Sequence, residues 1–219
     1  MNTASHELAS MLCSRLCHDL LSPVGALNNG LELLADEQDP EMRKRWFELL
    51  EQSAKASADK LKFFRLAFGA AGGFGEMVPV EEAQSVVNAL VGANERVEVR
   101  WALTAAKLPK PAIKTMLNLA SIALDSLLRG GTLDIGAELL DQSSEIVVRA
   151  TGDRIAFDDS IGKALQGTLP KDELSSRTAP AHMLYLVAED LGGGLQYKLD
   201  DNSLVLGAVL PRDSTGMIG

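Results

Sequence analysis

The sequence predicts an α+β fold in two parts, a long helical hairpin followed by a sandwich of mixed strands and helices. In the first part, apolar residues recur every three or four positions, which is typical of amphipathic helices. In the second part, short segments of alternating polarity are interspersed with helical segments and form hairpin-like pairs. This order favours an α+β sandwich over a doubly wound parallel sheet.

The helical hairpin is predicted from two consecutive apolar stripes. The first helix runs from about Ser5 to Ala35, and the second begins after a turn, with Pro40 at its first helical position, and runs to Phe68. Two helices alone cannot enclose their apolar faces, so we expect a homodimer in which two hairpins form a four-helix bundle. The stripe of the first helix consists of Leu8, Leu12, Leu16, Leu20, Val24, Leu27, Leu31 and Leu34.

A glycine-rich segment from Gly69 to Gly75 separates the two parts and is typical of a linker. We therefore assign residues 1–70 to the hairpin, 71–76 to the linker, 77–212 to the α+β domain and 213–219 to a tail. The run from Lys107 to Lys114 is interpreted as a solvated face. In the second domain the sequence predicts strands at 77–80, 96–103, 132–139, 145–150, 194–199 and 203–210, and helices at 81–91, 111–128 and 179–191.

Composition excludes several functional classes. The 219 residues include 21 Lys and Arg against 30 Asp and Glu, a net charge of -9, which argues against a general nucleic-acid binder. Apolar runs fall far short of the roughly 20 residues of a membrane helix, and the N-terminus lacks a signal-peptide pattern. We therefore expect a cytoplasmic protein without membrane contact. Cys13 and Cys17 are expected to be reduced thiols and supply no zinc-binding set.

The candidate reactive residue is His18, which lies off the apolar stripe and is expected to face solvent. A neutral imidazole has a free lone pair that can attack an electrophile. Asp19 is placed to orient the ring, and Arg15, one turn away, is placed to offset the charge of an incoming phosphoryl group. Ser22 adds a hydroxyl on the same face. Pro23 removes a backbone N–H beside this site, so a local bend is expected.

The run His18-Asp19-Leu20-Leu21-Ser22-Pro23 resembles the H-box of sensor histidine kinases, in which a histidine, an acidic residue, a small polar residue and a proline occur in this order. The resemblance implies that His18 is the phospho-accepting residue. Asp19 would then have an orienting role, and Arg15 and Ser22 electrostatic and hydrogen-bonding roles.

The second domain resembles the ATP-binding lobe of the same kinases, but its nucleotide motifs are altered. In the stretch 118–123, Ile122 replaces the metal-liganding asparagine of the N-box, and an aliphatic side chain cannot bind Mg²⁺. At 150–155, Ala150 stands where a carboxylate would meet adenine, and the glycine-rich box is replaced at 178–183. The resemblance therefore implies a degenerate histidine-kinase-like (GHKL or Bergerat-type) domain that binds no ATP, metal or other cofactor.

This combination is similar to ChpT-type histidine phosphotransferases of alphaproteobacterial phosphorelays, and the similarity extends from Leu8 to about Pro211. It implies a homodimer that passes a phosphoryl group from the receiver domain of a CckA-like hybrid kinase to CtrA-like and CpdR-like response regulators. The Mg²⁺ of the reaction would belong to the partner receiver domain. Two alternatives remain open, a divergent histidine kinase or phosphatase core and a non-catalytic dimeric scaffold.

Overall fold

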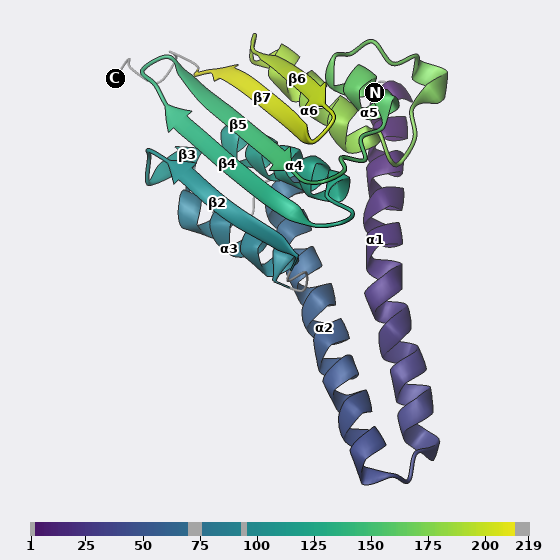
Figure 1. Ribbon diagram of the computed structural model, residues 1–219. Coiled ribbons are helices and arrows are strands. Elements are labelled where there is room, and N and C mark those ends of the chain that lie inside the picture. The colour runs from purple at the N-terminus through teal and green to yellow at the C-terminus, as the bar shows by residue number, and fades with distance from the viewer. Residues whose placement is uncertain (1–2, 70–75, 93–95, 213–219) are drawn as a thin grey trace.

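The computed structural model describes residues 3–69, 76–92 and 96–212 (Figure 1). Its first part is an antiparallel hairpin of two long helices, α1 (Thr3–Asp36) and α2 (Pro40–Phe68). The far end of the hairpin projects from the rest of the molecule as a stalk, whereas the start of α1 and the end of α2 lie against the second part (Figure 1). No helix in the described ranges is both long and apolar enough to cross a membrane.

The turn of the hairpin is fixed by side chains that bind free backbone groups. Asp39 caps α2, because its Oδ1 accepts the N–H of Glu41 at 3.0 Å. Arg43 reaches back across the turn and donates to the carbonyls of Leu34 at 3.2 Å and Glu37 at 2.9 Å. These contacts satisfy carbonyls at the end of α1 and so define where the chain reverses.

The second part contains a five-stranded sheet that is antiparallel except for the pair β2 and β4. Neighbouring strands pair in the order β2-β4-β5-β7-β6. A second, two-stranded sheet pairs β1 with β3 in antiparallel fashion. The strands are β1 (Met77–Pro79), β2 (Val97–Leu103), β3 (Lys107–Pro109), β4 (Gly131–Leu139), β5 (Ser143–Thr151), β6 (Gly194–Asp200) and β7 (Ser203–Pro211).

Helices cover one face of the large sheet and leave the other face open (Figure 1). Along β5 the side chains alternate between buried and exposed, as expected for a strand with one solvated face. Val147 on the open side is 51% exposed, whereas its neighbours Ile146 and Val148 are buried. The remaining helices are α3 (Val80–Val91), α4 (Lys110–Ser126), α5 (Asp159–Leu165), a 3₁₀ turn (Lys171–Glu173) and α6 (Ala179–Asp190).

The hydrophobic core of the second part continues into the hairpin. Phe63 and Ala67, near the end of α2, are buried together with residues of α3, α4 and the sheet. The hairpin is thus packed firmly against the domain at this end, because α2 contacts both α3 and α4. Residues 71–75 of the predicted linker and the tail at 213–219 lie outside the described residues, and the domain boundaries stay a prediction.

The structure confirms the predicted α+β sandwich and every strand and helix expected in the second part, with ends that differ by one or two residues. Three short elements were not predicted, namely β3, α5 and the 3₁₀ turn. The interpretation of 107–114 as a solvated face is wrong. Leu108 is buried in β3, and Ala112 and Ile113 are buried in the first turns of α4, so only part of this run faces water.

Candidate functional site

His18 lies on α1 where the hairpin passes the second domain, and its side chain is 84% exposed. Ser14 and Ser22, one turn before and one turn after, are also exposed. The predicted solvent-facing position of His18 is therefore confirmed. Small side chains on either side of the ring leave room for another molecule to approach it.

Asp19 lies close enough to orient the imidazole. Nδ1 of His18 is 3.3 Å from Oδ1 of Asp19. An ionised carboxylate only accepts hydrogen bonds, so this contact favours the tautomer with the proton on Nδ1. Nε2 then keeps its lone pair and is the atom available for nucleophilic attack.

Arg15 is held between two carboxylates. Its Nε donates to Oδ2 of Asp19 at 2.7 Å, and its Nη2 donates to Oδ2 of Asp125 at 3.0 Å. Partial burial lowers the pKa of Arg15, but the hydrogen bond to Asp19 and the charge of Asp125 outweigh this effect and raise the pKa above its usual value. The guanidinium therefore stays charged beside His18. Asp125 lies near the end of α4, so this pair joins the hairpin to the second domain.

A third contact binds the backbone of Asp19. Nζ of Lys60, on α2, donates to the carbonyl oxygen of Asp19 at 2.7 Å. In a regular helix this carbonyl would accept the N–H of residue 23, but Pro23 has none. Helix α1 nevertheless continues through Pro23 from Thr3 to Asp36.

Residues of two altered nucleotide motifs, at 118–123 and 178–183, line a small cavity of about 70 Å³ next to these residues. It is lined by Arg15 and Asp19 from the hairpin and by Asn118 and Ile122 from α4, together with phenylalanines of α2. Asn118 is buried, and its Nδ2 donates to the carbonyls of Lys114 at 2.9 Å and Ala67 at 3.4 Å. The first asparagine of the altered N-box thus ties α4 to the end of α2.

The other altered motifs contribute packing. Ala150 on β5 is fully buried under the helices, and Ala179 and Ala181, at the start of α6, are equally buried. At the next position of α6, the ring of His182 stacks on the ring of Tyr185, with centroids 6.0 Å apart. His182 is half-buried with its Nδ1 unpaired, and desolvation lowers its pKa.

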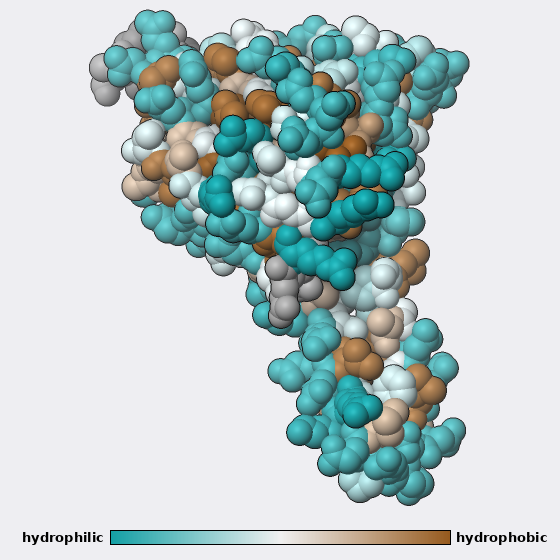
Figure 2. Space-filling model, in the orientation of Figure 1, coloured by the Kyte–Doolittle hydropathy of each residue, from teal (hydrophilic) through white to brown (hydrophobic). Residues whose placement is uncertain are grey.

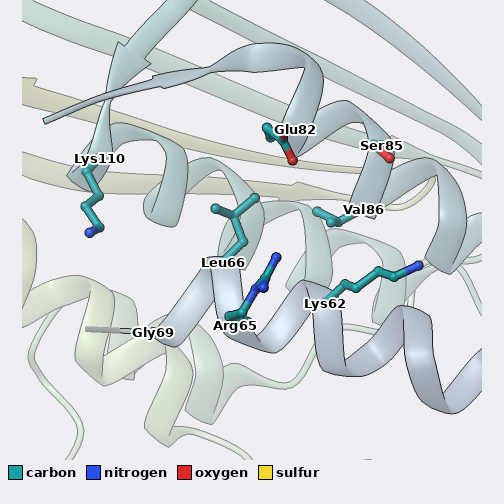
Figure 3. Close-up of a pocket in the computed structure, with 8 residues that line it drawn as sticks. All are labelled: Lys62, Arg65, Leu66, Gly69, Glu82, Ser85, Val86 and Lys110. Carbon is teal, nitrogen blue, oxygen red and sulfur yellow. The ribbon is translucent and has the colours of Figure 1, made fainter. Parts of the chain in front are cut away.

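A second hollow of about 90 Å³ lies between α2 and α3 (Figure 3). Figure 3 shows Lys62 and Arg65 of α2 opposite Glu82 and Ser85 of α3, with Lys110 at the other end. None of the predicted site residues lines it. Basic and acidic side chains are mixed here, so no single ligand charge is favoured.

The four predicted site residues lie within two turns of one helix, and the structure places the charged side chains of Arg15 and Asp19 in direct contact. Two further residues, Lys60 and Asp125, were not predicted. Pro23 could have indicated a contact of the kind made by Lys60, because a proline inside a helix leaves one carbonyl without its N–H partner, and that carbonyl then needs another donor. Asp125 is 110 positions from Arg15, and no local pattern indicates the contact.

Cys13 and Cys17 are free thiols, as expected.

Three comparisons relate the chain to known proteins. Residues 80–203 match the family described as "Histidine phosphotransferase C-terminal domain". The chain is 33% identical over 186 residues to "Protein phosphotransferase ChpT" of Brucella abortus (strain 2308), which covers 85% of this chain and 87% of that protein. A solved "Bacterial Phosphotransferase" superposes with a TM-score of 0.82 at 29% identity, over 95% of this chain and 98% of the other.

Proposed function

Because the chain belongs to the histidine phosphotransferase family, we propose that it relays a phosphoryl group through His18 in a phosphorelay. The donor is the phospho-aspartate of a hybrid kinase receiver domain, and the acceptors are receiver domains of response regulators. One observation carries the proposal. The His18 imidazole is 84% exposed while its Nδ1 lies against a carboxylate that is itself held in place.

In the transfer step, Nε2 of His18 attacks the phosphorus of the aspartyl phosphate in line with the leaving oxygen. The P–N bond forms as the P–O bond breaks, and the aspartate leaves as a carboxylate. Nδ1 keeps its proton, so the phosphorylated ring carries a positive charge that Asp19 offsets. Attack by the carboxylate of a second receiver reverses these bond changes and regenerates His18.

Arg15 and Ser22 assist the incoming group in this proposal. The guanidinium of Arg15 lies on the same side of α1 as His18 and stays charged, so it offsets negative charge on the phosphoryl oxygens. Ser22 is exposed one turn beyond His18, where its hydroxyl can donate to one of these oxygens. The protein thus supplies position and charge, and the Mg²⁺ of the reaction belongs to the receiver.

The receiver docks over the exposed part of α1 next to His18. Leu21 is 68% exposed in this region and offers an apolar contact, and the neighbouring serines leave the surface open. We propose CckA-like hybrid kinases as donors and CtrA-like and CpdR-like response regulators as acceptors. A relay protein must release each partner after transfer, and a modest interface favours that release.

The protein acts as a homodimer. Large apolar side chains remain exposed along the hairpin in a single chain, and a second hairpin would cover them. They include Val24 (47% exposed), Leu31 (56%), Leu33 (51%), Phe47 (55%), Leu49 (48%) and Leu61 (55%). Figure 2 shows apolar residues among polar ones on the visible face of this stalk.

The second domain does not bind ATP in this proposal. The cavity beside Ile122 has a volume of about 70 Å³, whereas sites for drug-sized ligands are typically about 300–1,000 Å³. Side chains of the hairpin form part of its wall, so the hairpin and the domain pack together where a nucleotide would have to enter.

The test compares the wild type with His18→Ala, and uses His6→Ala as a matched control on an exposed histidine of the same helix. Each protein is incubated with radiolabelled ATP alone and then with a phosphorylated receiver domain of a hybrid kinase. Label is expected on the wild type and His6→Ala only when the receiver is present, and never on His18→Ala. Labelling by ATP alone would instead indicate an active kinase core, and no labelling from a panel of receivers would indicate a scaffold.

A further inference from the structure

The carbonyl of Asp19 is an unusual backbone group, because the helix that contains it cannot supply its partner. In an α-helix each carbonyl accepts the N–H four residues later, and residue 23 is proline. A partly buried carbonyl without a donor loses a contact that water cannot fully replace. This carbonyl belongs to Asp19, the residue directly after His18, so its position bears on the reactive ring.

Lys60 supplies the missing donor from the other helix of the hairpin. Its Nζ is 2.7 Å from the Asp19 oxygen, a short charge-assisted hydrogen bond, and the side chain is half-buried. The charge of Lys60 also acts on Asp125, which binds Arg15. Lys60 therefore belongs to a cluster of two cations and two carboxylates from α1, α2 and α4.

Asp19 is thus held at both ends. Arg15 binds its side-chain Oδ2 at 2.7 Å, and Lys60 binds its backbone oxygen at 2.7 Å. The remaining carboxylate oxygen, Oδ1, faces Nδ1 of His18. Loss of the backbone contact would allow the peptide after His18 to shift, and the ring with it, while the surface that meets the receiver stays unchanged.

We propose that Lys60 is a positioning residue for phosphoryl transfer, which replaces the N–H that Pro23 lacks and so fixes Asp19 beside Nδ1 of His18. The proposal rests on the function proposed above, with His18 as the phospho-accepting residue. It makes Pro23 and Lys60 a coupled pair, since the Lys60 donor is needed only because residue 23 is a proline.

The first experiment measures transfer from a phosphorylated receiver to Lys60→Met over a range of receiver concentrations. We expect the maximal rate to fall about tenfold, which corresponds to about 1.4 kcal/mol and to the loss of one charge-assisted hydrogen bond. The half-saturating receiver concentration should not change, because Lys60 is not on the docking surface. Lys60→Arg keeps a donor and should recover most of the rate. Lys55→Met, an exposed lysine of the same helix, is the matched control and should behave as the wild type.

The second experiment is a double-mutant cycle with Pro23→Ala, which restores an N–H at residue 23. In that background the Asp19 carbonyl has its helical partner again, so Lys60→Met should slow transfer less than twofold. The melting temperature of each variant is recorded, and rates are compared below the lowest one, so that only folded protein is assayed.

The outcomes separate this inference from the proposed function. The positioning role would be wrong if Lys60→Met slowed transfer equally with and without Pro23, or did not slow it at all. Labelling of the wild type but not of His18→Ala would still support His18 as the phospho-accepting residue. A raised half-saturating concentration with an unchanged maximal rate would assign Lys60 to docking and also overturn it. Retention of label by His18→Ala would refute the proposed function itself.

Discussion

Replacing Asn118 tests whether the altered N-box has become a structural link between the two parts of the chain. Asn118 is 1% exposed, and its Nδ2 donates to the carbonyls of Lys114 and Ala67. Lys114 keeps its helical hydrogen bond in Asn118→Ala, so the main loss is the donor to Ala67. Loss of this buried hydrogen bond and the small cavity together should lower the free energy of unfolding by about 2 kcal/mol.

The assay is urea unfolding followed by circular dichroism. With a slope of about 2 kcal/mol/M, a loss of about 2 kcal/mol lowers the midpoint by about 1 M. Asn118→Asp should be less stable still, because a carboxylate would face two carbonyl oxygens. Ser121→Ala, about one turn further along α4, is the control, and its free energy of unfolding should change by less than about 0.5 kcal/mol.

The rate of phosphoryl transfer by folded Asn118→Ala should match that of the wild type, because the Asn118 amide donates to the carbonyls of Ala67 and Lys114 rather than to the residues that contact His18. The reasoning would be refuted by a variant with an unchanged midpoint that has lost transfer. Asn118 would then act in the chemistry, as it would in an active nucleotide site.

Three further predictions concern charge, pH and assembly. Asp125→Asn removes an exposed ion pair with Arg15, so the free energy of unfolding should fall by about 0.5 kcal/mol at low salt, and wild type and variant should converge in 0.5 M NaCl. His182 has a lowered pKa in the folded state, so its protonation favours unfolding, and stability should be lost as pH falls below about 6.5; His182→Gln should flatten this dependence in urea titrations. Leu31→Glu places a charge on the apolar stripe and should shift the protein from dimer to monomer in analytical ultracentrifugation.

Each of these has a contradicting result. A salt-independent deficit in Asp125→Asn would mean that the carboxylate has another structural role. An unchanged pH slope in His182→Gln would show that His182 is solvated in the folded state. Leu31→Glu that sediments as the wild type, beside an equally dimeric Glu32→Gln control, would place the hairpin interface elsewhere.

Much of the fold was predictable because the same hydrophobic pattern recurs many times along its long helices and strands. The stripe of α1 and the Asp39-Pro40 start of α2 define the hairpin, and the alternation in β5 and β7 defines two central strands. The exposed position of His18 followed from the same periodicity. These features depend on residues that are close together in the sequence, so the sequence alone is enough to predict them.

The features that were missed depend on distant partners or on few residues. β3 is a three-residue strand that pairs with β1, and the lysines in and after it suggested a solvated face. α5 has seven residues and a usable signal, since Asp158 accepts the N–H of Ser160, but it is too short for periodicity. The pairing of Arg15 with Asp125 depends on how two helices meet in space.

Among the described residues, β2 and β6 are the edge strands of the large sheet, and the charges on them bear on self-association. β2 carries Glu98 and Arg100 in a bidentate pair, and β6 carries Lys198 and Asp200 at 3.3 Å. Unpaired edge strands readily join edges of other molecules, and charged side chains there oppose such growth. Charged side chains on both edge strands therefore oppose edge-to-edge association, which leaves the exposed apolar residues of the hairpin as the surface for the proposed dimer.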